Sequence, residues 1–175
     1  MRNWTRTARS VVMAAGALAA LAACSGDSHM SGPDAVGRVA LRSVSPANGV
    51  TGVSITMPMA MTFSGPMGSD MEKYVVVHEG AVAGPAVAGR WNWSTDRRTL
   101  TFTPDAPLKS RTTYVIHMGG GMRGQNGMPL DYAQCAALGG RSVPGGMMGG
   151  GMGMMGPGWQ GADGGYGMTF TFTTA

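Results

Sequence analysis

The feature of this chain that most limits its fold is the repeated alternation of apolar and polar residues in short stretches. The clearest examples are residues 59–63, 99–103 and 168–173, the last of which reads Met-Thr-Phe-Thr-Phe-Thr. Successive side chains of a β-strand point to opposite faces of the sheet, so an alternating stretch has one apolar and one polar face. The pattern therefore predicts sheets that bury one face in a core and expose the other to water.

Frequent turn residues separate these stretches, and no stretch has a convincing helical period. Pro46 followed by Asn48 and Gly49 is one such turn, since proline fixes φ and Asn-Gly tolerates positive φ. The pattern predicts an all-β fold, a single antiparallel β-sandwich of about seven strands. We expect Trp91 or Trp93 to be the large side chain at the centre of its core. The expected strands lie near residues 39–44, 59–63, 74–78, 87–93, 99–103, 114–118 and 168–173.

An ordered set of short motifs runs through these strands. They are Val-Ser-Pro-Ala-Asn-Gly-Val at 44–50, Met-Thr-Phe-Ser at 61–64, Leu-Thr-Phe-Thr-Pro at 100–104, Thr-Thr-Tyr at 112–114, Gly-Met-Pro-Leu at 127–130 and Phe-Thr-Phe-Thr-Thr at 170–174. In this order they resemble the SbsA-like bacterial Ig-like domain over residues 41–175. The resemblance implies an immunoglobulin-like sandwich and the role of a spacer or adhesion element, without a particular activity.

The chain departs from this family in a Gly/Met-rich insertion at residues 131–167, where the family passes through a short loop into its last strand. Residues 144–158 consist almost only of glycine and methionine. Glycine at this density predicts an adaptable, disordered loop. We therefore expect its removal to leave the folding stability nearly unchanged. Cys135, at the start of the insertion, has three open roles: a buried unreactive thiol, an intermolecular disulfide or a soft metal ligand.

The methionines of the insertion suggest a soft metal, because thioether sulfur is a neutral donor that selects Cu(I). Clustered methionines on a flexible backbone can converge on one ion without a preformed cage. Methionine is also a pliable apolar residue, so an unliganded loop and an apolar contact with a partner or a membrane remain open. The candidate ligands are Met147, Met148, Met152, Met154 and Met155, with His117 and Met122 as further donors and Cys135, His78, Met118 and Met128 as additional ones.

The N-terminal segment has the character of an export signal. Arg2, Arg6 and Arg9 precede an apolar stretch at residues 11–23, which is too short for a membrane-spanning helix of ~20 residues. The stretch runs through Leu-Ala-Ala into Cys24, and this arrangement resembles the lipobox of a bacterial lipoprotein. The resemblance implies cleavage before Cys24 and lipid on its sulfur.

These patterns divide the chain into a signal peptide at residues 1–23, a flexible tether at 24–37 and an Ig-like domain at 38–175 that contains the insertion. The formal net charge is +4, from 13 Lys and Arg against 9 Asp and Glu. Removing the three signal-peptide arginines leaves ten basic residues against nine acidic ones, a net charge of +1. Nucleic-acid binding therefore has little support. No catalytic motif is evident, so an enzyme is not expected.

Two functions follow as hypotheses. The first is a membrane-anchored exported lipoprotein whose Ig-like domain is a binding or structural module. Its partners would be the lipid bilayer, through acylated Cys24, and an unidentified protein or other component of the envelope. Its location would be the cell envelope, at the outer membrane in a Gram-negative host. The alternative is a periplasmic Cu(I)-binding protein that uses the Met-rich insertion.

Overall fold

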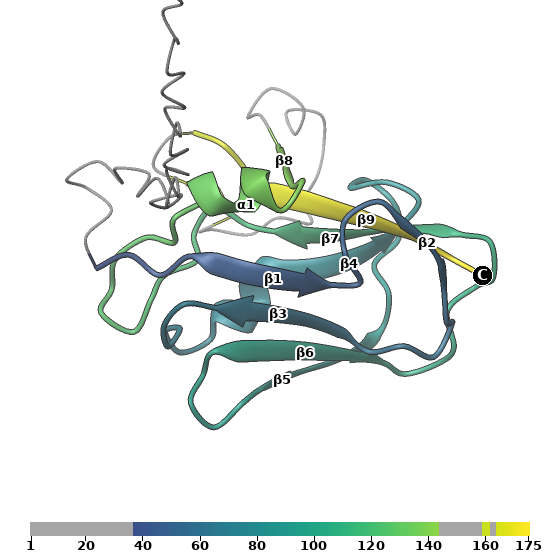
Figure 1. Ribbon diagram of the computed structural model, residues 1–175, viewed down its shortest axis with the longest axis horizontal. Coiled ribbons are helices and arrows are strands. Elements are labelled where there is room, and N and C mark those ends of the chain that lie inside the picture. The colour runs from purple at the N-terminus through teal and green to yellow at the C-terminus, as the bar shows by residue number, and fades with distance from the viewer. Residues whose placement is uncertain (1–36, 144–158, 162–163) are drawn as a thin grey trace, which may run out of the picture. The chain divides into compact units, whose positions relative to one another are not determined.

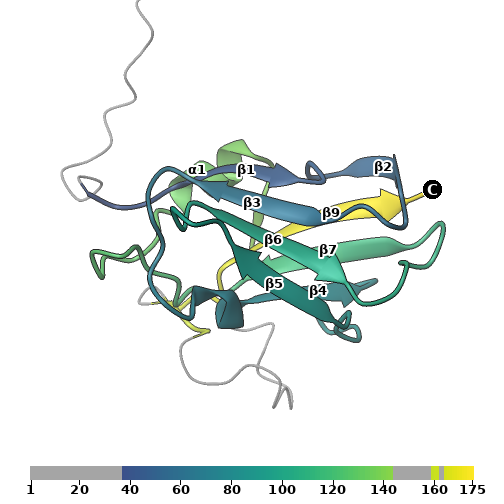
Figure 2. The same ribbon diagram turned by 90° about the horizontal axis from the view of Figure 1, so that it is seen from below.

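The computed structural model describes residues 37–143, 159–161 and 164–175, which form two facing sheets (Figures 1 and 2). The first sheet has the strand order β1-β3-β6-β5, and all of its neighbours are antiparallel. Its strands are β1 (Leu41–Ser45), β3 (Met59–Phe63), β6 (Thr99–Pro104) and β5 (Gly89–Trp93).

The second sheet has the order β2-β9-β7-β4, and the short strand β8 also pairs with β9. The β4–β7, β7–β9 and β8–β9 pairs are antiparallel, whereas β2 runs parallel to β9. The strands of this sheet are β2 (Val50–Val53), β9 (Met168–Thr174), β7 (Thr113–Met118), β4 (Val75–Glu79) and β8 (Arg141–Ser142).

The all-β sandwich predicted from the sequence is confirmed, and each of the seven expected strands is present. Two further strands, β2 and β8, escaped the prediction. β2 has the sequence Val-Thr-Gly-Val and is mostly exposed, while β8 has only two residues, both exposed. Neither has an alternating pattern, so only their pairing with β9 identifies them as strands.

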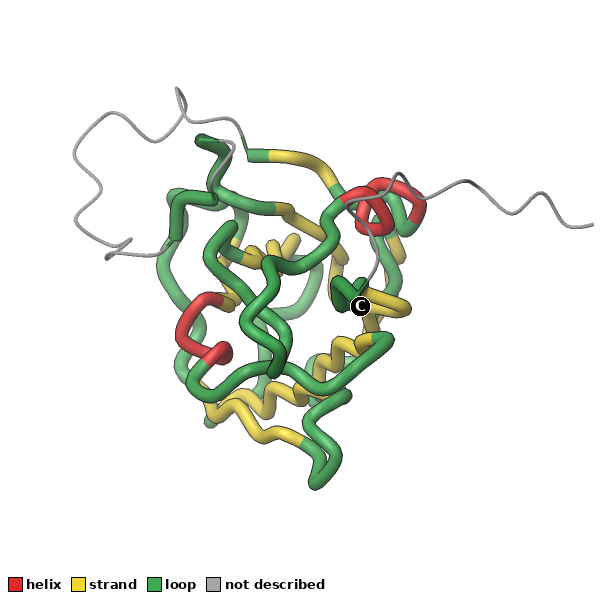
Figure 3. Tube along the Cα trace, turned by 90° about the vertical axis from the view of Figure 1, so that its left-hand side faces the viewer, coloured by secondary structure: helices red, strands yellow, loops and turns green. Residues whose placement is uncertain are grey.

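Two short helical segments also escaped the prediction (Figure 3). They are the α-helix α1 (Ala133–Ala137) and the 3₁₀ helix η2 (Met71–Tyr74). Segments of one turn are too short to show a helical period, and isolated helices of this length are unstable in water. α1 is therefore held by its packing, with Cys135 completely buried.

The core lies between the two sheets and is made of the apolar residues that alternate along the strands. Its largest fully buried side chains are Tyr114, Phe102, Phe170, Phe172, Leu41, Met59, Met61, Met67, Leu100, Ile116, Met118 and Met122. The burial pattern of β3, with three buried residues separated by two half-buried ones, is the alternation expected from its sequence.

The expectation that Trp91 or Trp93 fills the centre of the core is wrong. Both are only partly buried, because β5 is an edge strand of the first sheet and packs at the rim of the core. The indole N–H of Trp93 donates to the Glu72 carboxylate at 2.7 Å, a bond that a central position between the sheets would forfeit.

Tyr114, near the start of β7, joins the core to the chain that precedes this strand. Its ring stacks on Phe172 with the centroids 5.5 Å apart, and its hydroxyl accepts a hydrogen bond from the Lys109 backbone N–H at 2.9 Å. A tyrosine whose hydroxyl bonds the backbone a few residues upstream is a recurrent feature of immunoglobulin-like sandwiches.

Candidate functional site

The described parts of the insertion, residues 131–143, 159–161 and 164–167, pack on the sandwich, whereas the expected disordered loop at residues 144–158 lies outside the described residues. At the first end, Asp131 donates its backbone N–H to the Val39 carbonyl at 2.8 Å, and α1 buries Cys135. β8 then adds to β9 through the pairs Arg141–Thr169 and Ser142–Met168. These contacts are long-range, so the local sequence carries no sign of them.

At the other end, Trp159 lies on the second sheet and is only 6% exposed. Its ring is 5.1 Å from the His117 ring and meets Tyr74 edge-on at 6.2 Å. Its carbonyl accepts a hydrogen bond from the Gly120 N–H at 2.8 Å. A β-carbon at Gly119 would lie 2.5 Å from the Trp159 ring, so only glycine allows this approach.

The two ends meet each other beside Trp159. The Val143 N–H donates to the Gly167 carbonyl at 2.9 Å, and the Tyr166 N–H donates to the Val143 carbonyl at 2.8 Å. Gly167 has a φ of +87°, and a β-carbon there would lie 1.8 Å from the Met118 carbonyl oxygen. Val143 and Trp159, the described residues on either side of 144–158, are therefore both held by backbone hydrogen bonds.

His78 on β4 and His117 on β7 lie on the face of the second sheet that points away from the core. In the strand register, His117 pairs with Val76 and His78 pairs with Val115, which makes the two histidines diagonal neighbours on one face. Their ring centroids are 6.2 Å apart. Despite facing away from the core, His78 is only 4% exposed and His117 is completely buried.

Each histidine has one ring nitrogen bonded to a backbone carbonyl. His78 Nδ1 is 2.9 Å from the Gly84 oxygen, and His117 Nε2 is 2.7 Å from the Tyr166 oxygen. A carbonyl can only accept, so both of these nitrogens carry the proton. His78 Nε2 and His117 Nδ1 are buried and have no hydrogen-bond partner among the described residues, an arrangement that costs about 1–3 kcal/mol for each such group.

Burial lowers the pKa of His117 below its ordinary value of 6.5. The bond to the Tyr166 carbonyl acts in the opposite direction, and the neighbouring His78 lowers the pKa further. At neutral pH, His117 is therefore an uncharged imidazole with one free lone pair, which is the form that binds a metal ion.

The lowered pKa of His117 makes stability depend on pH. Because the folded-state pKa lies below the unfolded value of about 6.5, the unfolded chain takes up the proton first as the pH falls. The contribution is thus full above the unfolded pKa and is lost below it, by up to ~1.4 kcal/mol per pH unit. We expect urea unfolding to show a larger loss of stability from about pH 7.5 to about pH 5.5 in the wild type than in His117→Gln. Equal losses in the two proteins would contradict this assignment.

Cys135 does not contribute to this face. Its thiol is completely buried in the core cluster, and burial raises its pKa to about 12, with nearby Asp131 adding to the shift. A thiol of this kind is not a thiolate at neutral pH, and thiolate is the form that reacts and binds metals. Of the three roles left open by the sequence, the structure supports the buried, unreactive one.

The remaining donors predicted from the sequence do not gather around His117. Met122 and Met118 are completely buried in the core cluster between the sheets, on the opposite side of β7 from His117, and Met128 is exposed. Among residues 37–143, 159–161 and 164–175, no group of three or more His, Cys, Asp or Glu side chains is placed to hold a metal ion. Met147, Met148, Met152, Met154, Met155 and Cys24 lie outside the described residues.

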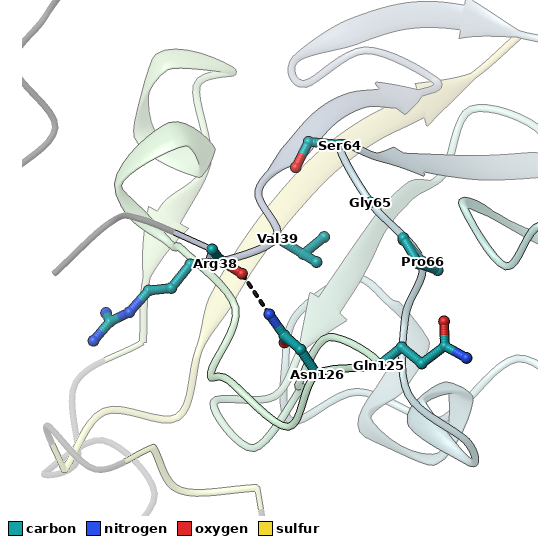
Figure 4. A pocket seen from close by; sticks show the side chains of 8 residues that line it. Arg38, Val39, Ser64, Gly65, Pro66, Gln125 and Asn126 are labelled. Atoms are coloured by element: carbon teal, nitrogen blue, oxygen red, sulfur yellow. Dashed lines mark hydrogen bonds between the residues drawn. The ribbon is translucent and has the colours of Figure 1, made fainter.

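A separate, open pocket of about 480 Å³ lies where the start of the described chain meets two loops (Figure 4). The Asn126 side chain has a structural role there, since it donates to the Gly37 carbonyl at 2.6 Å and accepts from the Met128 N–H at 3.1 Å. The Arg38 side chain extends away from Pro66 and Gln125 (Figure 4). The residues that line the pocket include no acid–base pair.

Within the described part of the chain, no helix combines the length and apolar character that crossing a bilayer requires.

Comparisons with solved structures find similarities that extend over only part of each chain. L,D-transpeptidase 1 of Mycobacterium tuberculosis is 22% identical, with a TM-score of 0.37 over 45% of this chain and 35% of that one. The S-layer protein SbsC is 15% identical, with a TM-score of 0.39 over 54% and 12%. The alpha-2-macroglobulin of E. coli is 18% identical, with a TM-score of 0.41 over 54% and 6%.

A search of curated proteins finds no match to the chain. The family comparison is decisive for the fold. Residues 36–135, more than half of the chain, match the bacterial Ig-like domain family. The match ends at residue 135, within the insertion at residues 131–167. With the sheet orders β1-β3-β6-β5 and β2-β9-β7-β4, this match shows that the chain belongs to the bacterial Ig-like domain family.

Proposed function

We propose that this protein is an exported lipoprotein that holds one Ig-like sandwich at the cell envelope as a binding or structural module. The observation that carries the proposal is the match to a family of non-catalytic Ig-like modules, in a chain whose residues 11–24 resemble a lipoprotein signal. The residues from 24 to 37 would then be the tether between lipid and domain.

The proposed anchor is the sulfur of Cys24. A single acyl chain holds a protein on a membrane only marginally, at ~0.8 kcal/mol per buried methylene, whereas two or more chains hold it stably. Bacterial lipoproteins carry a diacylglyceryl group, so the attachment would be lasting. Ser25, which follows the cysteine, favours the outer membrane in a Gram-negative host.

Changing Cys24 to serine tests the anchor directly. We expect the wild-type protein, expressed in a bacterium, to lose residues 1–23, gain the mass of its fatty-acyl chains and sediment with membranes. Cys24→Ser should be neither acylated nor processed at this position. Intact-mass spectrometry and membrane fractionation measure both outcomes, and Cys135→Ala is the matched control that keeps the lipid. A wild-type mature protein without acyl chains would refute the anchor.

A second candidate function, Cu(I) binding by the methionines of the insertion, is favoured by where the ends of their segment are held. Val143 and Trp159 flank residues 144–158, and the Trp159 ring is 5.1 Å from the His117 ring. Val143 is bonded to Tyr166, whose carbonyl accepts from His117. The described residues that flank the methionine segment thus lie close to a neutral imidazole, and thioether and imidazole are both ligands that suit copper.

Exchanging Met147, Met148, Met152, Met154 and Met155 for leucine tests this function. Leucine keeps the apolar volume and removes the sulfur, so stability should hardly change. If the methionines bind copper, competition with a Cu(I) chelator should show an affinity reduced by roughly tenfold or more, since thioether is the soft donor that selects Cu(I). An unchanged affinity would exclude the methionines as ligands.

A further inference from the structure

The outer face of the second sheet carries two buried imidazoles, and each has one ring nitrogen without a hydrogen-bond partner among the described residues. We propose that His78 Nε2 and His117 Nδ1 together form a buried two-ligand site for Cu(I). The site shares His117 with the copper hypothesis above, but it rests on the two imidazoles and does not require the methionines of the insertion.

The hydrogen bonds of both histidines are those of metal ligands. A histidine that binds a metal almost always donates its other ring N–H to a carboxylate, a backbone carbonyl or water, which fixes the tautomer and the ring orientation. His78 donates Nδ1–H to the Gly84 oxygen, and His117 donates Nε2–H to the Tyr166 oxygen. The two remaining nitrogens both present lone pairs, so they cannot bond each other without a proton or a cation between them.

The separation of the rings matches a shared ion. Two imidazoles that bind one ion through bonds of ~2.0 Å have their ring centroids roughly 6 Å apart when the two bonds are nearly collinear. The His78 and His117 centroids are 6.2 Å apart. A tetrahedral angle at the ion would bring the rings about an ångström closer, so the spacing favours near-linear, two-ligand coordination, which is common for Cu(I) and Ag(I) and unusual for Zn²⁺.

The composition of the site also favours a monovalent ion. Imidazole binds metals as an uncharged ligand, and no cluster of three or more His, Cys, Asp or Glu in the described ranges offers further ligands of these types. No carboxylate is among the groups that shift the pKa of His117. A divalent ion would bring twice the charge into a buried place without a counter-charge, at a much higher desolvation cost. Trp159 covers His117 and limits the access of water.

The test uses two substitutions that keep each structural hydrogen bond and remove only the proposed ligand. In His78→Asn the amide NH₂ replaces Nδ1–H, and in His117→Gln it replaces Nε2–H, so both carbonyls keep a donor. His29→Gln, which removes the third histidine of the chain, is the control. The full-length chain in detergent is titrated with Cu(I) against a chelator. Ag(I), which does not change oxidation state, is added to protein with ¹⁵N-labelled histidine for NMR.

We expect each of His78→Asn and His117→Gln to weaken Cu(I) binding by roughly a hundredfold or more, since even the loss of an outer partner of a ligand costs ~10–100-fold. His29→Gln should bind as the wild type does. Ag(I) should shift the ¹⁵N signals of His78 Nε2 and His117 Nδ1 without releasing a proton. Because the NMR experiment uses the wild type, it remains informative if a variant fails to fold.

Two results would overturn the site. One is that His78→Asn and His117→Gln both fold and both bind Cu(I) with the affinity of the wild type. The other is Ag(I)-induced shifts confined to His29 or absent from all three histidines. The leucine variant of the five methionines separates the two copper proposals. Loss of binding in that variant alone would leave the methionine hypothesis and exclude the histidine pair. Loss in the histidine variants alone would do the reverse.

Discussion

Trp159→Ala is expected to lower the free energy of unfolding by about 3–5 kcal/mol, the cost of removing a buried large aromatic side chain. The indole is only 6% exposed and packs on His117 and Tyr74 over the outer face of the second sheet. Its loss would open this face to water, together with the backbone of Gly119 against which it lies. Urea unfolding of the full-length chain, followed by circular dichroism, measures the change.

The matched control exchanges residues 145–157 for a Gly/Ser linker of equal length. Because the length of the loop is unchanged, the closure entropy is nearly constant. We expect a change within about 0.5 kcal/mol, which is usual for substitutions away from packed features. A large loss in the linker variant would contradict the expectation that residues 144–158 form a disordered loop, and a loss below about 1 kcal/mol in Trp159→Ala would contradict the packing role of Trp159.

Phe102→Ala is the second change with a large expected effect, also about 3–5 kcal/mol. Phe102 is 2% exposed in the centre of the first sheet, and its ring lies 4.7 Å from that of Trp91. A β-carbon at Gly89 would be 2.3 Å from the Phe102 ring, so the backbone of β5 closes tightly over it. Removing the ring would leave a cavity that neighbouring strands cannot easily fill.

Trp91→Ala is the comparison for Phe102→Ala. Although tryptophan is larger than phenylalanine, Trp91 is only partly buried on an edge strand. We expect a smaller loss, about 1–2 kcal/mol, because less apolar surface returns to water. The two unfolding midpoints, measured under the same conditions, decide the order. If Trp91→Ala lost more free energy of unfolding than Phe102→Ala, Trp91 would be the more important side chain of the core, contrary to this assignment.

The contrast between these two residues shows what the sequence could reveal about the core. Alternation in residues 99–103 assigns Phe102 to the buried face, and the structure places it there. The same reasoning groups Trp91 and Trp93 on one face of their strand, as observed. It does not reveal that this strand is at the edge of its sheet, because strand order depends on long-range pairing.

The candidate site illustrates the same limit. The sequence predicts His117 as a metal donor and places it opposite the apolar face of its strand. It groups Met122 with His117, whereas the structure puts Met122 in the core on the other side of the sheet. It treats His78 only as an additional donor, although the strand register makes it the neighbour of His117. No local signal was available for His78, because it follows the uninterrupted apolar run Val75–Val77, in which no face can be assigned by alternation.

The sequence by itself determined seven of the strands and, where apolar and polar residues alternate, which face of the strand is apolar, because alternation is a local property of a β-strand. The tertiary structure decided what covers the other face of the second sheet. Trp159 and Tyr166 contact His117 there from a distant part of the chain, whereas His78 is bonded to Gly84 in the loop that follows its own strand. A strand pattern shows only that a side chain faces away from the core, and burial on that side depends on where a distant segment returns.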